Sequence, residues 1–334
     1  MGQQPRQWAI VVHGGAGGID REALGPARDK EYREALSEAV KAGAAVLDHG
    51  GSSLDAVEAA ARVMEDDPHF NAARGAVFTA DGKTQLDAAI MDGATLRAGA
   101  VADVTHTRHP ITLARAVMEK TPYVLLVGSG ADAFSLAAGM EQEDAAFFFT
   151  ETRWQSLVKQ LQKEGKPIPP RPAGAPPTEQ ATPLGQWQEP ADMSRYGTVG
   201  VVALDRKGNV AVATSTGGLQ GKMPGRVGDS PLIGAGTYAS NQSCAVSGTG
   251  VGEFFIRYTV AREICALVQH KGFTLQQAAD EVIHKQLAPV HGDGGVIAIA
   301  SDGEVAWSLN TPGMFRARQV EGGKIEAHIY SDEP

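Results

Sequence analysis

Apolar runs along the first half of the chain predict strands and helices in mixed order. A strand is expected over 8–12, where five mostly apolar residues end at the glycine-rich run His13-Gly14-Gly15-Ala16-Gly17. Apolar residues at helical spacing predict helices over 30–48 and 54–64, the second behind the N-cap candidates Ser52 and Ser53. The same criteria predict a β-hairpin of 76–79 with 85–90, a short buried strand over 123–127, and helices over 111–120, 132–140 and 151–162.

The second half of the chain is richer in predicted strands. Helices are expected over 253–269 and 275–286, and strands over 198–204, 210–215, 233–239, 243–247, 296–300 and 305–309. Groups of helices and strands in this order predict an α+β protein with layered sheets that helices cover on each side.

A proline-rich segment over 163–193 separates the two halves. It has few large apolar residues and eight prolines: Pro167, Pro169, Pro170, Pro172, Pro176, Pro177, Pro183 and Pro190. Such a segment buries too little surface to offset the entropy lost on ordering. We therefore expect an exposed, flexible linker that divides the chain into two parts without dividing it into two domains.

Composition narrows the class of protein. A hydrophobic content of 43% with 21% charged residues is typical of a soluble globular enzyme, and the net charge of −9 argues against a nucleic acid or an anionic membrane as partner. No apolar run approaches the roughly 18 residues of a membrane span, and the N-terminus lacks a hydrophobic secretory core, so a cytoplasmic location is expected. The two cysteines, Cys244 and Cys265, are expected to be reduced thiols inside a core.

The most informative pair is Gly197-Thr198, at the beginning of a predicted strand directly after the linker. If the bond between them were cut, Thr198 would carry both a hydroxyl nucleophile and a free α-amine. Such an amine has a reference pKa of about 7.7–8.0 and can accept the hydroxyl proton near neutral pH, whereas an amide cannot. Gly197 has no side chain to block attack on its carbonyl. The pair alone is weak evidence, because many strands begin this way.

Three further segments strengthen the case for a hydrolase. The polar run 214–218 ends the next strand, so strand pairing would bring hydroxyl groups beside Thr198. Arg226 and Asp229 lie in a Gly/Pro-rich loop, where they suit the carboxylate and ammonium of an amino-acid-like substrate, although a surface ion pair would look the same. The glycine-rich run 247–253 precedes a predicted helix, and such a turn directs backbone N–H groups at an oxyanion or a phosphate.

Taken together, these motifs resemble the plant-type asparaginase and isoaspartyl peptidase family of N-terminal nucleophile hydrolases. The resemblance extends over nearly the whole chain and is poorest in the linker. Its motifs are His13-Gly14-Gly15-Ala16-Gly17, Phe70-Asn71-Ala72, Arg74-Gly75-Ala76-Val77, Leu86-Asp87-Ala88, Met91-Asp92-Gly93, Gly197-Thr198-Val199-Gly200, the run 213–218, the run 224–231 and the glycines of 292–295.

The resemblance implies a fold and an assembly. The fold would be a four-layer αββα sandwich, one domain over 1–334, with two antiparallel-rich sheets covered by helices. Autocleavage would separate an α subunit, 1–197, from a β subunit, 198–334, and two such α/β heterodimers would form a dimer. No cofactor would be needed for catalysis.

The resemblance also implies residue roles. Thr198 would be the nucleophile and Thr216 its hydrogen-bonding support, while Asn71 would orient the cleavage region. The remaining roles are an oxyanion hole made by Thr249 and the Gly250 amide, and a substrate pocket made by Arg226 and Asp229 with the Gly250 and Gly252 backbone. Gly248 and Val251 depart from the expected turn, which puts the positioning of the oxyanion donors in doubt.

A structural sodium ion is implied as well, held by backbone carbonyls in a loop that otherwise reads as an ordinary helix-to-strand turn. The carbonyls would be those of Met64, Glu65, Asp67, Phe70, Ala72 and Arg74.

Three hypotheses on function remain. The first is an autoprocessing amidohydrolase that cleaves isoaspartyl dipeptides and L-asparagine through a β-aspartyl ester on Thr198. The second is a glycosylasparaginase, which cleaves the same bond on a larger leaving group. The third is a glycine-rich binding protein that uses the same fold without catalysis.

Overall fold

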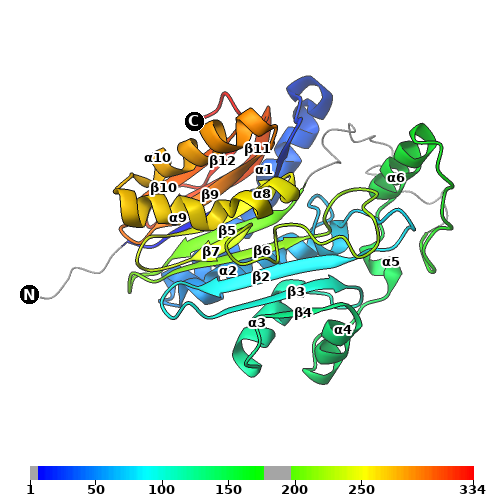
Figure 1. Cartoon of the computed structure of the whole chain (residues 1–334), viewed down its shortest axis with the longest axis horizontal. Coiled ribbons are helices and arrows are strands. Elements are labelled where there is room, and N and C mark those ends of the chain that lie inside the picture. The colour runs from blue at the N-terminus through cyan, green and yellow to red at the C-terminus, as the bar shows by residue number, and fades with distance from the viewer. Residues whose placement is uncertain (1–6, 177–196) are drawn as a thin grey trace, which may run out of the picture.

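The structure is a computed structural model, and it describes residues 7–176 and 197–334. Two sheets form its centre (Figure 1). The eight-stranded sheet has the order β12-β11-β1-β5-β6-β2-β3-β4, and the four-stranded sheet has the order β10-β9-β8-β7. The strands are β1 (Ala9–Gly17), β2 (Leu86–Asp92), β3 (Ala98–Val104), β4 (Leu125–Val127), β5 (Val199–Leu204), β6 (Val210–Thr216), β7 (Thr237–Ala239), β8 (Cys244–Gly250), β9 (Gly294–Ala300), β10 (Val305–Leu309), β11 (Gly313–Val320) and β12 (Glu326–Tyr330).

Helices cover both sheets. Helices α1, α2 and α3 pack on the larger sheet, and α9 and α10 pack on the smaller one. The helices are α1 (Arg21–Asp48), α2 (Ser53–Asp66), α3 (Pro110–Lys120), α4 (Gly128–Ala137), α5 (Ala145–Phe148), α6 (Glu151–Lys163), α8 (Gly252–Tyr258), α9 (Val260–Lys271) and α10 (Leu275–Asp280), with short helical turns η1 (Ala73–Gly75), η4 (Glu281–Leu287) and η5 (Ala288–Val290). None of the helices in the described ranges is long and apolar enough to cross a membrane.

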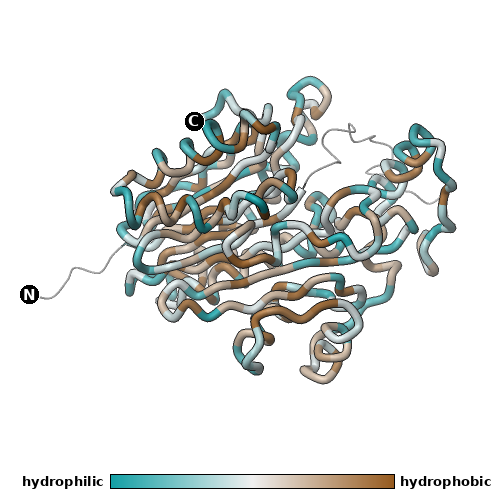
Figure 2. The backbone as a smooth tube through the Cα atoms, in the orientation of Figure 1, coloured by the Kyte–Doolittle hydropathy of each residue, from teal (hydrophilic) through white to brown (hydrophobic). Residues whose placement is uncertain are grey.

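The two sheets pack face to face through an apolar layer. Val11 of β1, Val202 of β5 and Val212 of β6 meet Ile297 and Ile299 of β9 in this layer. Figure 2 shows the same distribution, with apolar colour concentrated in the strands and hydrophilic colour on outer helix turns. All strand pairs are antiparallel except β3 with β4. The predicted α+β sandwich of two antiparallel-rich sheets between helices is confirmed.

Local sequence signals account for several element boundaries. The Ser52 side chain accepts a hydrogen bond from the Asp55 amide at the start of α2, as its N-cap position predicts. Thr274 and Gln277 form a capping box at the start of α10. The predicted pairing of the strand after Thr198 with the next strand is also confirmed, because β5 and β6 are antiparallel neighbours.

The predicted hairpin of 76–79 with 85–90 is wrong. The turn at Asp81-Gly82 does close locally, since the Thr79 amide donates to the Lys83 carbonyl at 2.8 Å. However, the strand that follows, β2, pairs with β3 and β6 and not with 76–79. A local turn signal does not determine which strand becomes the neighbour in the sheet.

Other predicted elements differ in burial or continuity. The strand at 123–127 is the exposed edge strand β4 and is not buried, with Val127 at 55% exposure. The helix predicted over 253–269 is two helices, α8 and α9, because Thr259 adopts a left-handed conformation with φ 48°. The helix predicted over 275–286 is α10 continued by the π-helical turn η4. Strands β3, β11 and β12 were not predicted.

The prediction of two reduced cysteines is also wrong. Cys244 begins β8 and Cys265 lies on α9, which packs on that strand. The packing brings their Cα atoms to 5.4 Å, and the two residues form a disulfide. A separation of 21 residues gave no indication of this contact, which depends on tertiary packing.

The first part of the predicted linker, as far as residue 176, lies within the described residues. Arg171 pairs with Glu151 of α6 at 2.7 Å, and its guanidinium lies 4.7 Å from the ring centroid of Phe149. Part of the segment after α6 therefore contacts this helix, while most residues from 163 to 176 are exposed. The rest of the predicted linker, 177–193, lies outside the described residues.

Candidate active site

Thr198 lies at the start of β5, near the middle of the larger sheet. The register of β5 with β6 pairs Val199 with Ser215 and Gly200 with Thr214, which places Thr216 opposite Thr198. Their hydroxyl oxygens are 3.1 Å apart, and both residues are buried. The structure thus brings together the predicted nucleophile and its predicted support.

The carbonyl oxygen of Gly197 is the focus of the site. It accepts hydrogen bonds from the Thr216 hydroxyl at 2.9 Å and the Asn71 side-chain amide at 2.8 Å, and the Thr198 hydroxyl lies 2.8 Å away. Asn71 is fixed in turn, because its amide nitrogen also donates to the Gly218 carbonyl and its oxygen accepts from the Val77 amide. Donors at this oxygen stabilise negative charge that develops when the adjacent carbon is attacked.

The end of β1 contacts the same bond through its backbone. Gly15 has a φ of +115°, and a Cβ atom there would lie 3.0 Å from the Gly197 Cα and 3.5 Å from the Thr198 nitrogen. A side chain at Gly14 would overlap the Phe70 ring. The glycine-rich run, which forms the last part of β1 and does not follow the strand as expected, therefore allows a close backbone approach to the Gly197–Thr198 bond.

His13 is a buried neutral residue of this region. Its Nε2 lies 2.9 Å from the Ser247 hydroxyl, and burial lowers the pKa of its imidazole to about 3, against a smaller opposing effect of the Thr198 backbone. The Ser247 hydroxyl continues into a buried series of hydrogen bonds through Thr214 and Thr237 to the Ser230 carbonyl. This series joins strands β1, β8, β6 and β7 to the loop that holds Asp229, and the motif analysis missed it.

Thr249 and Gly250 are positioned by the end of β8. The Thr249 hydroxyl accepts a hydrogen bond from the Ala16 amide at 3.4 Å, next to the Gly15 that contacts Gly197. Gly250 has a φ of +152° and lies against the Asp293 carbonyl, where a side chain has no room. Within the described chain, no hydrogen bond joins either residue to Gly197 or Thr198. They adjoin the site without contacting the Gly197 carbonyl.

The departures noted at Gly248 and Val251 have a local explanation. A Cβ atom at Gly248 would lie 2.8 Å from the Phe255 ring of α8, so a glycine is needed at that position. The Val251 amide donates to the Asp293 carbonyl at 2.9 Å and begins the turn into α8.

The side chains of Arg226 and Asp229 lie close to Gly252. A Cβ atom on Gly252 would lie 2.7 Å from the Asp229 Oδ1 and 3.0 Å from the Arg226 Nη2. Glu253 forms an ion pair with this guanidinium, with 3.0 Å between the Glu253 Oε1 and the Arg226 Nη2. Burial raises the pKa of the Asp229 carboxyl to about 7, although Arg226 acts in the opposite direction. Within the described residues, the Asp229 Oδ2 has no hydrogen-bond partner, which suits an acceptor reserved for a ligand.

This charged pair adjoins the hydroxyl pair through Gly218. The Gly218 amide donates to the Thr216 hydroxyl at 3.0 Å, and a Cβ atom on Gly218 would lie 3.4 Å from the Arg226 Nη1. One loop therefore links the Thr198 and Thr216 hydroxyls to the Arg226 and Asp229 side chains.

A buried ion pair behind this loop was missed by the sequence analysis. The Lys222 Nζ lies 4.0 Å from the Asp87 Oδ2 and donates to the Gln85 carbonyl at 2.9 Å. Burial lowers the pKa of the Lys222 amine and raises that of the Asp87 carboxyl. Asp87 is the register partner of Thr216 across β2 and β6. The available signal was one charged residue, Asp87, inside a motif that was quoted but given no role, whereas Lys222 lies between two quoted runs.

The six residues predicted to bind sodium lie between the end of α2 and η1. The carbonyls of Pro68 and Phe70 converge on Gly75, where a Cβ atom would overlap both. The side chain of Glu65 has a different environment, because it accepts hydrogen bonds from the Ser215 hydroxyl at 2.7 Å and the Ile111 amide at 3.0 Å beside His109. Burial raises the pKa of this carboxyl. No group of three or more potential His, Cys, Asp or Glu metal ligands occurs among the residues that the structure describes.

Known proteins resemble this chain over nearly its full length. The family model described as asparaginase matches residues 6–329. Isoaspartyl peptidase of Escherichia coli is 46% identical over 97% of this chain and 96% of its own. A probable isoaspartyl peptidase/L-asparaginase 2 of Arabidopsis thaliana is 43% identical over 97% of this chain and 99% of its own. An isoaspartyl peptidase/L-asparaginase of Homo sapiens is 40% identical over 97% of this chain and 96% of its own. The chain therefore belongs to the asparaginase family.

Proposed function

We propose that this protein is an autoprocessing amidohydrolase that cleaves isoaspartyl dipeptides and L-asparagine through a β-aspartyl ester on Thr198. The observation that carries the proposal is the contact of the Thr198 and Thr216 hydroxyls with the Gly197 carbonyl, beside the Arg226 and Asp229 pair. Family membership and the names of the relatives support the same activity.

Autocleavage begins with attack of the Thr198 hydroxyl oxygen on the Gly197 carbonyl carbon. The oxygen of that carbonyl then carries negative charge, which the Thr216 hydroxyl and the Asn71 amide stabilise from 2.9 and 2.8 Å. The carbon–nitrogen bond breaks, and the hydroxyl proton ends on the Thr198 nitrogen as it becomes an amine. Water then hydrolyses the resulting ester, which leaves Gly197 with a carboxylate and Thr198 with a free α-amine.

Substrate hydrolysis repeats this chemistry on an external bond. Arg226 binds the α-carboxylate of the aspartyl group, and ionised Asp229 binds its α-ammonium. The Thr198 amine accepts the hydroxyl proton, and the hydroxyl oxygen attacks the β-carbonyl carbon. The proton passes to the departing amine, and water hydrolyses the β-aspartyl ester. Thr249 and the Gly250 amide are the proposed donors to the oxyanion of this second reaction.

The test is a Thr198→Ala variant beside the wild-type chain. Wild type is expected to give two fragments of roughly 20 and 14 kDa, in proportion to 197 and 137 of the 334 residues and 35.0 kDa, and to hydrolyse asparagine. The variant is expected to stay at 35.0 kDa and to release no ammonia. Turnover by the variant, or by uncut wild type, would refute the mechanism. A wild-type chain that stays at 35.0 kDa and releases no ammonia would leave the binding-protein hypothesis.

A substrate panel separates the two enzymatic hypotheses. Arg226 and Asp229 bind the aspartyl portion, which asparagine, β-aspartyl-leucine and GlcNAc-asparagine share. Hydrolysis of the first two with little hydrolysis of the third supports the proposed activity. A preference for the third would make this chain a glycosylasparaginase.

We also propose that the loop after α2 holds a structural sodium ion. The carbonyl oxygens of this loop suit a hard cation, and those of Pro68 and Phe70 converge at Gly75. The backbone carbonyls of Met64, Glu65, Asp67, Phe70, Ala72 and Arg74 would hold the ion, whose role would be to fix the loop that carries Asn71. A thermal stability that is higher in sodium chloride than in equimolar choline chloride would support this site.

The assembly proposed for the cleaved chain is a dimer of α/β heterodimers. The edge strand β4 supports an interface, because it combines unpaired backbone groups with exposed apolar side chains. These side chains are Tyr123, Val124, Leu125, Val127 and, on α4, Leu136. Wild type is expected to sediment at about twice the mass of one chain. The Val127→Lys variant is expected to sediment at the mass of one chain.

A further inference from the structure

A buried lysine lies directly behind the proposed aspartyl-binding pair. Lys222 precedes Arg226 in the loop after β6, and its side chain is only 1% exposed. This side chain lies against Gly218, where a Cβ atom would be 2.9 Å from both the Lys222 Cδ and the Lys222 Nζ. The same atom would lie 3.4 Å from the Arg226 Nη1. An ammonium and a guanidinium therefore flank one glycine, and the covered ammonium can act only through its neighbours.

Gln85 holds this loop at two points. The Lys222 Nζ donates to the Gln85 carbonyl at 2.9 Å, and the Gly225 amide donates to the Gln85 side-chain oxygen at 2.9 Å. One residue thus fixes both the Lys222 side chain and the backbone directly before Arg226. The Lys222 backbone is fixed as well, because its carbonyl accepts from the Ala80 amide at 2.8 Å.

Asp87 supplies the countercharge and joins the loop to the central sheet. The Lys222 Nζ lies 4.0 Å from the Asp87 Oδ2, and Asp87 is fully buried. The Asp87 Oδ1 accepts from the Asp103 amide at 2.9 Å, which fixes the carboxylate from β3. Asp87 on β2 is also the register partner of Thr216 on β6 (Figure 1). The ion pair therefore connects the loop to the strand that carries the partner of the nucleophile.

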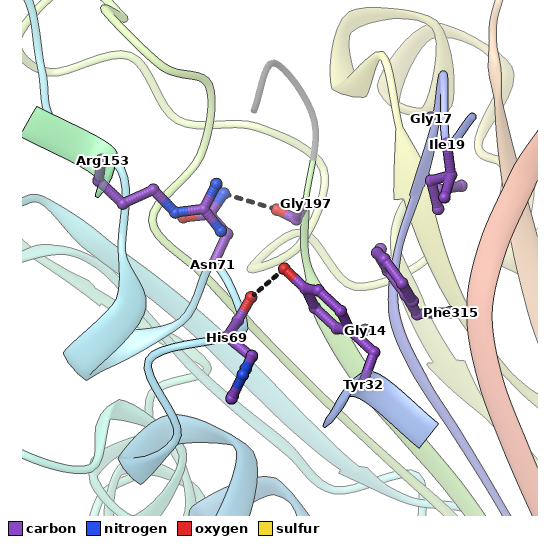
Figure 3. Close-up of a pocket in the computed structure, with 11 residues that line it drawn as sticks. Gly14, Gly17, Ile19, Tyr32, His69, Asn71, Arg153, Gly197 and Phe315 are labelled. Carbon is purple, nitrogen blue, oxygen red and sulfur yellow. Dashed lines mark hydrogen bonds between the residues drawn. The ribbon is translucent and has the colours of Figure 1, made fainter. Parts of the chain in front are cut away.

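The glycine between the two cations is itself held in place. The Asn71 side-chain amide donates at 2.8 Å to the Gly218 carbonyl and at 2.8 Å to the Gly197 carbonyl, the second of which is drawn in Figure 3. The Gly218 amide donates to the Thr216 hydroxyl at 3.0 Å. The Lys222 ammonium thus rests on a fixed backbone beside the guanidinium. Repulsion between the two like charges opposes movement of the guanidinium toward Gly218.

The guanidinium has neighbours on its other side as well. The Arg226 Nε donates to the Glu253 Oε1 at 3.0 Å, and a Cβ atom on Gly252 would lie 3.0 Å from the Arg226 Nη2. Lys222 and Glu253 together keep the guanidinium between Gly218 and Gly252. Two neighbouring cations also make the potential there more positive, which favours a bound carboxylate.

We propose that Lys222 is a positioning residue for Arg226. Its buried ammonium, together with the Gln85 side chain at the end of the same turn, keeps the guanidinium where it binds the α-carboxylate of the substrate. The inference rests on the proposed function and deepens it, because it adds a residue that sets how strongly the α-carboxylate is recognised without touching it. Gln85 and Asp87 belong to the proposed α subunit and Lys222 to the β subunit, so the two fragments build this arrangement together.

The experiment measures recognition of the α-carboxylate in cleaved Lys222→Met, which keeps an unbranched side chain and removes its charge. Two inhibitors are compared, L-aspartate and its α-amide, in which a neutral amide replaces only the α-carboxylate. The preference for aspartate, given by the ratio of the two inhibition constants, is expected to fall about 10-fold, within the value of one charge-assisted pair. The KM for asparagine should rise while kcat changes less. Lys207→Met removes a charge from an exposed position in the turn between β5 and β6, and this matched control should keep the wild-type preference.

A double variant separates positioning from simple charge balance. Lys222→Met alone leaves the Asp87 carboxylate buried without its countercharge, whereas Lys222→Met with Asp87→Asn removes both charges. The proposal expects the preference for aspartate to stay low in the double variant. A wild-type preference in either Lys222→Met or the double variant would overturn the positioning role.

Failure of the proposed function is distinguishable from failure of this inference. Wild type that neither cleaves itself nor hydrolyses asparagine would refute the function, whereas active wild type with unaffected variants refutes only the role of Lys222. If neither Lys222 variant folds and cleaves, Gln85→Met decides, because it removes the partner of the Gly225 amide and leaves both buried charges in place. Its preference for aspartate is expected to fall about 3- to 10-fold, the value of one hydrogen bond. An unchanged preference in that variant would overturn the proposal.

Discussion

Thr216 holds its hydroxyl 3.1 Å from the hydroxyl of Thr198, where β6 ends and β5 begins. The Thr216 oxygen also accepts from the Gly218 amide, and its proton is directed to the Gly197 carbonyl at 2.9 Å. In the proposed mechanism, this one side chain orients the nucleophile and stabilises the oxyanion of autocleavage. The antiparallel register of β5 with β6 is enough to establish this contact.

Replacing Thr216 by Val is expected to slow autocleavage about 100-fold or more, since loss of one oxyanion donor costs roughly that factor. The side chain keeps its size and loses the hydroxyl. A time course of the two fragments on a denaturing gel measures the rate. Thr216→Ser retains the hydroxyl and is the control, expected to cleave at a rate much closer to wild type. Equal rates for wild type and Thr216→Val would contradict the role.

Asn71→Asp is expected to slow autocleavage as well, for an electrostatic reason. The substitution removes the N–H group 2.8 Å from the Gly197 carbonyl and places a carboxylate beside the developing negative charge. The defect should be smaller at low pH, where the carboxyl is protonated and can donate. Intact-mass measurements during incubation at several pH values provide the test. A cleavage rate as fast as that of wild type at pH 8 would exclude this role for Asn71.

The sequence predicted the contacts made by neighbouring strands better than those made by distant ones. Thr198 and Thr216 were placed together correctly, because β5 and β6 are consecutive and a short turn joins them. Strand β11 was missed because polar residues interrupt its apolar pattern, as in Arg316, which is buried and donates to the Tyr330 carbonyl. The Cys244–Cys265 contact and the Lys222–Asp87 pair depend on packing between separate elements, which periodicity does not encode.

Binding of the aspartyl group is expected to weaken below about pH 7. Burial raises the pKa of Asp229 to about 7, so the carboxylate needed for the ligand ammonium is lost as the pH falls through that value. The inhibition constant of the product L-aspartate, measured from pH 5 to 9, reports this ionisation without involving the chemical step. Asp229→Asn should bind aspartate weakly at every pH. A constant that does not change across pH 7 in wild type would show that Asp229 is not the titrating group.

Ionisation of Asp229 also lowers the free energy of unfolding. Folding stability is therefore favoured by low pH, whereas ligand binding is favoured by high pH. The folded-state pKa of Asp229 is raised above its ordinary value of 3.8, so the folded protein binds a proton more tightly than the unfolded chain. Stability contributed by this group is therefore lost as the pH rises from about 4 to about 7. Asp229→Asn is expected to raise the melting temperature relative to wild type more at pH 8 than at pH 5. Differential scanning calorimetry would contradict this if the gain were larger at pH 5.

Gly252→Ala is expected to raise KM for asparagine by about 10-fold or more while the protein stays folded and cleaved. The added methyl would lie 2.7 Å from the Asp229 Oδ1 and 3.0 Å from the Arg226 Nη2, so it would displace the two groups proposed to bind the aspartyl ends. Loss of one charge-assisted hydrogen bond accounts for a change of this size. The matched control is Gly130→Ala on α4, where no atom lies within 4 Å of the new methyl group. Because Gly252 acts through binding, kcat should fall less than kcat/KM, and a loss confined to kcat would place Gly252 elsewhere in the mechanism.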